Sequence, residues 1–410
     1  MIIDRIRSRL RGLGLAAYVA TSPSTVFYTS GFQSYFLSEW WRWHGSVIVV
    51  IPADEASEPA LMVSDFEAPH AGHASPIHDV RSFRVWVELR DAAEIAGAAL
   101  TTADAGRPAQ FDGNELEQII RGILRDRQLT TARLGVDLRS TPVEALRRLE
   151  RAVPGAEWID FTDSIYAIRS IKLPFEVERL RRATELSEAG MEFAASQATS
   201  GLTAVDFSRL YTIGVLAAAR GQERYADYSD QWIIPGVGHA VGIGASSERG
   251  GIGLQEGDLI KFDCGVTVDG YRSDGGRTFS FAAPTAQARH LYDVLQAAHD
   301  RAVATVEPGT PARVVFQAAQ DFIRANGYPS FTRGHYGHSL GIDTFHEEPP
   351  YLAANDETYI EAGMVLAVET PAYSADVGPI MIEDLLHLST HGIERLHKMP
   401  RMLRPAGGSG

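Results

Sequence analysis

The sequence predicts two domains, an α/β domain followed by an α+β domain. The chain has 410 residues, which is too long for one ordinary core and suits two. In the first half, short apolar strands alternate with amphipathic helices, whereas in the second half strand-like segments lie between and after longer helices. We therefore expect domains over residues 1–168 and 169–403, with residues 404–410 as a terminal tail.

The first domain is expected to open with an amphipathic helix over residues 4–13 and a short apolar strand from Leu15 to Ala20. The β-branched run Val47–Ile51 predicts a buried strand. The segment Thr141-Pro142-Val143-Glu144 predicts a helix start, because threonine can cap, proline suits the first turn and glutamate completes a capping box.

The second domain is expected to begin with a long helix from about Phe175 to Gln197. Another helix is predicted from Thr203 to Gly221, and two more over residues 285–305 and 311–325. Four strand-like segments lie among and after these helices: Leu259–Phe262, Arg277–Phe281, Val365–Val368 and Ile380–Ile382.

The composition disfavours some classes of partner and indicates the compartment. The formal net charge is −14, which disfavours nucleic acids and anionic membranes as partners. Cys264 is the one cysteine, so an internal disulfide cannot form, and this fits a reducing compartment. The N-terminus lacks the apolar core of a signal peptide, and the apolar runs are too short to cross a membrane. We therefore expect a soluble, cytoplasmic protein.

A pair of aspartates follows strand-like segments in the second domain. Asp263 ends the apolar run Leu259–Phe262, and Asp274 comes 11 residues later. Gly270 lies between them and predicts a hairpin turn, which would bring the two carboxylates side by side.

A pair of glutamates is arranged in a similar way. Glu369 ends the run Val365–Val368, and Glu383 comes 14 residues later, after Ile380–Ile382. Carboxylates on strands among apolar neighbours are costly to bury, and four of them would repel one another at pH 7. Two divalent cations would resolve that repulsion. With His338 as a further ligand, oxygen donors and one imidazole suit Mn, Co, Zn or Fe.

These motifs resemble the pita-bread metallopeptidases, which include methionine aminopeptidase, aminopeptidase P and prolidase. The order Asp, Asp, His, Glu, Glu carries the resemblance, together with Arg169–Lys172, Glu176 and Glu256–Leu259. The stretch from Ser22 to Phe32 looks like the N-terminal domain of the two-domain members, aminopeptidase P, prolidase and creatinase. The resemblance implies a creatinase-type N-terminal domain, a pita-bread catalytic domain with a curved antiparallel sheet, and a homodimer.

The resemblance also implies a role for each ligand of a dinuclear centre. Asp263 would chelate one metal, His338 and Glu369 would bind the other, and Asp274 and Glu383 would bridge both. Manganese is the expected metal, with zinc, cobalt or iron as alternatives. The two ions, roughly 3.5–4 Å apart, would lower the pKa of a bridging water so that hydroxide attacks an amide carbonyl. Glu369 could also shuttle the proton.

The substrate-facing positions depart from the resemblance in part. His346 is placed to stabilise the tetrahedral intermediate or to steer the leaving group. The substrate-side histidine usually found before the first aspartate is missing, and His239 is the nearest replacement. Met381 stands where these peptidases usually carry arginine, and Gly276 where they often carry threonine. The metal ligands are kept while the substrate-facing groups change, as expected if the substrate differs.

The segment Ser38–Gly45 is the most unusual, with three tryptophans in four residues. Tryptophan faces bind cations well, and an arginine can hold a carboxylate. We hypothesise that Trp40, Trp41 and Arg42 contribute to the substrate pocket. A packing patch between domains or between subunits is the alternative.

The predicted function is metal-dependent hydrolysis of an amide C–N bond, as in Xaa-Pro aminopeptidases and dipeptidases. Two alternatives use the same fold and metals: a small-molecule amidohydrolase similar to ectoine hydrolase, and a lyase of a zwitterionic substrate. A non-enzymatic binding module is a remote alternative, because such modules generally lose ligands and all five are present here.

Overall fold

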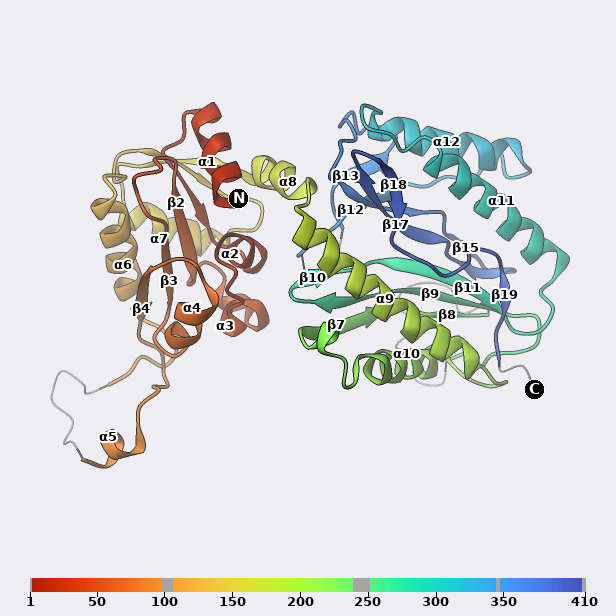
Figure 1. Cartoon of the computed structure of the whole chain (residues 1–410), viewed down its shortest axis with the longest axis horizontal. Helices are drawn as coiled ribbons and strands as arrows, with labels where there is room; N and C mark the ends of the chain where they lie inside the picture. Colours follow the sequence, from red (N-terminus) through yellow and green to blue (C-terminus); the bar gives the residue numbers. More distant parts are fainter. Residues whose placement is uncertain (1, 98–105, 239–250, 344–346, 408–410) are drawn as a thin grey trace. The chain divides into compact units, whose positions relative to one another are not determined.

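The computed structural model describes residues 2–97, 106–238, 251–343 and 347–407. The chain divides into two compact units, Met1–Ile168 and Arg169–Gly410 (Figure 1). Within the described ranges, no helix combines the length and apolar character needed to cross a membrane.

The N-terminal unit is built on a six-stranded sheet with the order β4-β3-β2-β1-β5-β6. The pairs β1–β2 and β2–β3 are antiparallel, and the other pairs are parallel. The strands are β1 (Ala17–Ala20), β2 (Ile48–Pro52), β3 (Ala60–Ser64), β4 (Asp79–Phe83), β5 (Arg133–Val136) and β6 (Glu157–Asp160). The predicted α/β class of this domain is confirmed.

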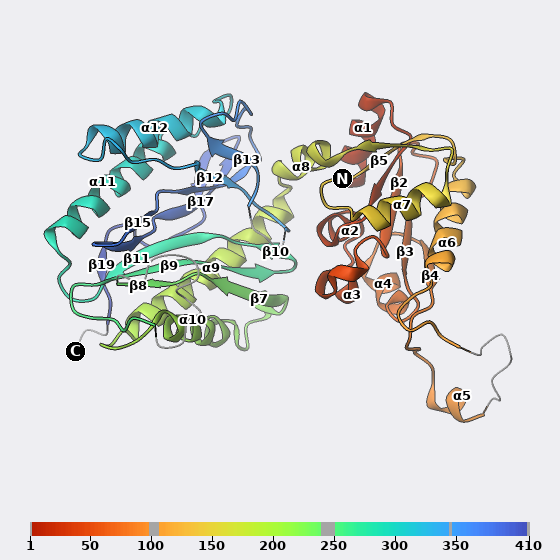
Figure 2. The ribbon, with the colours of Figure 1, turned by 180° about the vertical axis from the view of Figure 1, so that it is seen from behind.

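Helices pack on this sheet and close the core of the unit (Figure 2). Buried side chains of α6 and α7 share one core with β1, β2 and β3, while α1 and α2 contact β1 and β2. The helices are α1 (Ile2–Leu13), α2 (Pro23–Ser30), α3 (Tyr35–Glu39), α4 (Ala68–Ala74), α5 (Ala92–Gly97), α6 (Gly113–Asp126), α7 (Val143–Ala152) and α8 (Thr162–Ser170), with the 3-10 turn η1 (Trp41–Trp43).

The start of α7 differs from the predicted capping box. Pro142 is the N-cap residue, and no side chain caps this helix. Thr141 instead donates to the backbone carbonyl of Asp137 at 2.7 Å and shares a hydrogen bond with Thr21 at 2.7 Å. The helix begins where proline and glutamate predict it, but the threonine hydroxyl binds residues that directly follow β5 and β1.

The C-terminal unit contains an 11-stranded sheet whose main path runs β10-β9-β11-β17-β14-β12-β13. Its strand pairs are antiparallel except β11 with β19. The strands are β7 (Tyr228–Ile233), β8 (Gly236–Val237), β9 (Leu259–Val268), β10 (Tyr271–Arg272), β11 (Gly275–Ser280), β12 (His335–Ser339), β13 (Glu348–Ala353), β14 (Val365–Glu369), β17 (Glu383–Ser389), β18 (Gly392–Arg395) and β19 (Arg404–Pro405). The predicted α+β domain with a curved antiparallel sheet is confirmed.

Two helix pairs cover the C-terminal sheet, α9 (Pro174–Ser196) with α10 (Ala204–Ala219) and α11 (Ala286–Val303) with α12 (Ala312–Ala325). Alternate residues of the strands face these helices: Cys264 packs against the first pair, and Leu386 against the second. Cys264 is fully buried, as predicted. The remaining alternate residues of β9, β11, β14 and β17 point to the opposite face, which we call the ligand face.

Two local predictions in this unit are wrong. The strand predicted over Ile380–Ile382 ends at Ile380, because β16 (Gly378–Ile380) forms a separate hairpin with β15 (Ala372–Ser374). Residues 404–407, expected as part of a tail, are docked: β19 pairs with β11, and Gly407 donates its backbone N–H to Ala195.

Candidate metal centre

Strand register places three of the predicted carboxylates side by side on the ligand face. Gly276 of β11 lies opposite Asp263 of β9 on one side and opposite Glu383 of β17 on the other. Glu369 of β14 lies opposite Glu383. Because directly opposed residues point to the same face of a sheet, the three carboxylates line one surface, with the glycine between two of them.

Asp274, His338 and Glu383 form a close cluster that could hold a metal ion. One possible ligand atom from each lies within 4.8 Å of the others, and their exposed fractions are 1–2%. His338 Nε2 lies 3.4 Å from Asp274 Oδ2. His338 Nδ1 donates to the carbonyl of Ser339 at 2.8 Å, which leaves Nε2 as the ligand atom facing the cluster.

The electrostatics of the cluster call for cations. Burial, followed by the charges of Asp274, Glu369 and Asp263, raises the pKa of Glu383 well above its usual value. Glu383 Oε2 is buried and has no hydrogen-bond partner among the described residues. Burial alone would lower the pKa of His338, but the hydrogen bond and charge of Asp274 raise it to about 9. Oxygen donors with one imidazole fit a divalent transition metal, so the residues present fit the predicted group.

The other two predicted ligands already have basic neighbours. Lys261 Nζ donates to Asp263 Oδ2 at 2.9 Å. Arg333 donates to Glu369 Oε1 at 2.9 Å, and His335 Nδ1 lies 3.3 Å from the same oxygen. The sequence analysis missed Lys261 and Arg333. Strand alternation offered a signal for Lys261, because residues two apart on a strand share a face.

The proposed substrate residues that can be described fall in both units. Met381 is 2% exposed, and its backbone N–H donates to Thr278 Oγ1 at 2.8 Å. Trp40 stacks on Trp86 within the N-terminal unit, with ring centroids 5.2 Å apart, and its role in a substrate pocket stays a prediction. Arg42 is exposed.

Three predicted residues cannot be placed. His239 and His346 lie outside the described residues, as does the side chain of Trp41. Their roles stay predictions.

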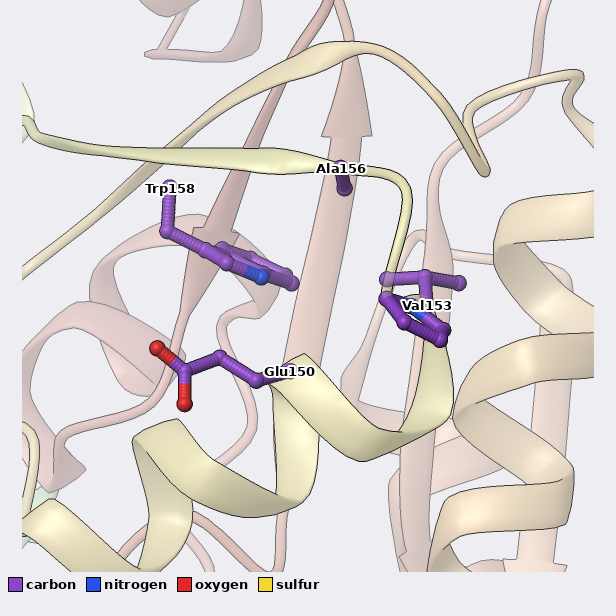
Figure 3. Close-up of a pocket in the computed structure, with 5 residues that line it drawn as sticks. Glu150, Val153, Ala156 and Trp158 are labelled. Atoms are coloured by element: carbon purple, nitrogen blue, oxygen red, sulfur yellow. The ribbon is translucent and has the colours of Figure 1, made fainter.

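A cavity of about 370 Å³ lies in the N-terminal unit, at the end of α7 and the start of β6 (Figure 3). It is lined by Glu150, Val153, Pro154, Ala156 and Trp158. Its lining contains none of the predicted ligands and none of the substrate residues that the structure describes.

Relatives resemble the chain over most of its length. It is 25% identical to a putative dipeptidase of Bacillus subtilis, with 98% of each chain covered. It is 28% identical to an Xaa-Pro dipeptidase of Pyrococcus furiosus over 60% of this chain and 68% of that protein. The fold matches the prolidase of Pyrococcus horikoshii with a TM-score of 0.76 and 21% identity, covering 98% of this chain and 99% of that one.

Family models account for both units. Residues 2–171 match the creatinase/prolidase N-terminal domain, and residues 178–390 match metallopeptidase family M24. The second match covers more than half of the chain and contains every residue of the candidate centre. The chain therefore belongs to metallopeptidase family M24 and is a metal-dependent hydrolase.

Proposed function

We propose that the chain is a dinuclear metal-dependent hydrolase of amide C–N bonds that acts on Xaa-Pro peptides as a dipeptidase or aminopeptidase. The observation that carries this proposal is the ligand face, where the Asp274–His338–Glu383 cluster adjoins Asp263 and Glu369. Relatives named as Xaa-Pro dipeptidases support the substrate class.

Asp263, Asp274, His338, Glu369 and Glu383 would hold two divalent ions, with manganese proposed and zinc, cobalt or iron as alternatives. When bound, the ions would lower the pKa of water and polarise the scissile carbonyl. The hydrogen bond from His338 Nδ1 to Ser339 fixes the imidazole ring and keeps Nε2 directed into the site.

Glu369 is proposed to move the proton. It lies opposite Glu383 at the end of β14, at the edge of the cluster, and is 6% exposed. Arg333 and His335 both contact its Oε1 atom and so orientate the carboxylate. In this role Glu369 accepts the proton of the attacking water and returns it to the leaving amine. His346 and His239 are proposed to contact the substrate.

A second candidate is hydrolysis of a small non-peptide amide, as in ectoine hydrolase. Met381 favours it, because a buried apolar side chain stands beside the ligand face where the peptidases usually carry arginine. A lyase of a zwitterionic substrate would use the same metals. These alternatives differ from the first proposal in substrate, not in the metal ligands.

The test is a substrate panel with manganese-loaded protein, containing Xaa-Pro dipeptides, Xaa-Pro tripeptides and ectoine, each with and without chelator. Glu383→Gln is the inactivating variant. Glu357→Gln is its matched control, since it makes the same change at a side chain that is 71% exposed. Chelator-sensitive release of proline or of the N-terminal residue, lost only in Glu383→Gln, is expected. Turnover of ectoine alone would overturn the peptidase proposal, and purification without stoichiometric metal would favour a binding module.

We also expect a cytoplasmic homodimer. Light scattering checks the assembly: a mass near that of one 44.7 kDa chain would contradict the dimer.

A further inference from the structure

A buried lysine lies within the acidic face. The Lys261 side chain is 1% exposed. Its Nζ atom donates to Asp263 Oδ2 and to the hydroxyl of Tyr373, each at 2.9 Å. Tyr373 itself is 45% exposed. Burying an ammonium group is costly unless it is paired, and the hydrogen bonds to Asp263 and Tyr373 supply that pairing.

Lys261 acts on Asp263 from the same strand. Residues two apart on β9 point to the same face, so the lysine and the aspartate lie next to each other on the ligand face. The hydrogen bond to Oδ2 limits rotation of the carboxylate. The second hydrogen bond, to Tyr373, anchors the ammonium to the β15–β16 hairpin, which is 112 residues away in sequence. Asp263 is therefore held by a lysine that is itself anchored from a distant part of the unit.

Two neighbouring positions shape the space beside the Lys261–Asp263 pair. Thr278 lies opposite Lys261, and its Oγ1 atom bonds both the backbone N–H and the backbone carbonyl of Met381, at 2.8 Å and 3.0 Å. A Cβ atom added to Gly276 would lie 2.1 Å from Met381 Cγ. The methionine side chain thus occupies the space that a residue larger than glycine would need at position 276.

The departures from the family pattern at positions 276 and 381 are therefore linked, because the Met381 side chain fits only where position 276 has no side chain. The absent side chain at Gly276 makes room for Met381 on the ligand face, between the strands of Asp263 and Glu383. A longer, charged side chain at position 381 would extend over the same face. It would bring a second cation towards Lys261.

We propose that Lys261 is the positioning residue for Asp263, and that Lys261, Gly276 and Met381 depend on one another. The ligand face then accommodates a cationic side chain at position 261 or at position 381, but not at both. This inference rests on the proposed metal centre and adds residues that the ligand pattern does not include. Lys261 need not touch the substrate; it acts through the orientation of Asp263.

The test is a double-mutant cycle with Lys261→Met, Met381→Arg and the double variant. Manganese affinity is measured by titration and kcat/KM with the best substrate. Each single variant is expected to lose about 10–100-fold in manganese affinity and in kcat/KM, as changes to groups that support a metal ligand do. In the double variant, manganese affinity and kcat/KM are expected to be at least about tenfold higher than the product of the two single effects predicts. The reason is that the pair of positions again holds one cation, now at position 381 in place of position 261. Lys398→Met, an exposed lysine changed in the same way, is expected to behave as wild type.

Independent, multiplying effects in the double variant would overturn the proposal, as would an unchanged Lys261→Met enzyme. If Lys261→Met does not fold, Met381→Arg decides the question alone: unchanged manganese affinity in that variant would overturn the proposal. The manganese titration does not depend on the substrate. If manganese affinity shows the coupling but Xaa-Pro peptides are not hydrolysed, the interdependence of Lys261, Gly276 and Met381 stands and the proposed substrate is refuted. If Xaa-Pro peptides are hydrolysed but manganese affinity shows no coupling, the proposed substrate stands and the interdependence is refuted.

Discussion

Glu383 and Asp384 are consecutive residues of β17 that point to opposite faces of the same sheet, and both are nearly fully buried. Asp384 forms a 2.6 Å ion pair with Arg277, and Arg401 lies 3.5 Å away. Burial opposes its ionisation, but the charge and hydrogen bond of Arg277, together with His299 and His397, outweigh burial and lower the pKa of Asp384 far below its usual value. Glu383 has three carboxylates nearby, and its pKa is raised.

The difference shows that the surroundings, not the residue type, separate a structural carboxylate from a candidate ligand. On the helix-covered face, arginine side chains supply the compensating charge within the fold. On the ligand face, the Oε2 atom of Glu383 has no hydrogen-bond partner among the described residues, and burial and the nearby carboxylates raise its pKa, so we propose that a bound cation supplies the compensating charge. Each of the following predictions tests one side of this comparison.

Removing the arginine from the helix-covered face should have the largest effect. Arg277→Met removes the 2.6 Å partner of buried Asp384 and leaves it only the longer contacts to Arg395 and Arg401, which is expected to cost about 3–5 kcal/mol of unfolding free energy. Denaturant unfolding at pH 7 measures it. The double variant with Asp384→Asn is expected to recover part of the loss. A loss below about 1 kcal/mol in the single variant would show that the pair is not essential.

Removing the carboxylate from the ligand face should instead affect activity. Glu383→Gln is expected to reduce kcat/KM by more than the roughly 100-fold seen when a residue that only supports a ligand is changed. It should also stabilise the metal-free protein at high pH. The raised pKa means that the folded state holds the proton more strongly, so wild-type stability is lost as pH rises through the folded pKa, and glutamine removes this loss. Equal pH profiles of stability for the two proteins would contradict the assignment.

Metal should stabilise the wild type through the ligand face. At a free manganese concentration of 100 times Kd, binding to the folded state adds about 2.7 kcal/mol to the unfolding free energy. Thermal unfolding of chelator-treated and reloaded protein measures the gain. Glu383→Gln should show little gain, whereas Glu357→Gln should match the wild type. A gain that survives in Glu383→Gln would place the metal elsewhere.

A buried histidine on the helix-covered side of the sheet should cause a smaller loss of unfolding free energy as the pH falls. His299 donates from Nε2 to the carbonyl of Val368 at 2.9 Å, and Arg401 lies 3.0 Å from its Nδ1 atom. Burial, followed by Arg401, lowers the pKa of His299 to about 4. The unfolded chain therefore binds more protons below pH 6.5, and stability falls as pH drops. The expected loss is about 2 kcal/mol between pH 6.5 and 5.

His299→Gln tests that loss, since its amide can still donate to Val368 but does not titrate. The difference in unfolding free energy between pH 6.5 and 5 should shrink by about 2 kcal/mol in the variant. An unchanged pH dependence would assign the acid sensitivity to other groups, such as His397, whose pKa is lowered by burial to about 3.

Local pattern predicted much of the C-terminal unit. Apolar alternation identified β9, β11 and β14 and placed Asp263 and Cys264 on opposite faces, because side-chain direction on a strand repeats every two residues. The same pattern failed at residues 380–383. Glu383 opens β17 and does not follow a continuous strand, because β16 pairs locally with β15.

The sequence by itself determined the two-domain class, the order of the candidate ligands and the face on which each strand residue lies, since these depend on periodicity and composition within short windows. Only the tertiary structure decided which charges meet. Arg277 pairs with Asp384 across 107 residues, Lys261 meets Tyr373 across 112, and residues 404–406 bond to β11. Such pairings depend on which strands become neighbours, and that choice minimises the energy of the whole sheet, so no local window contains it.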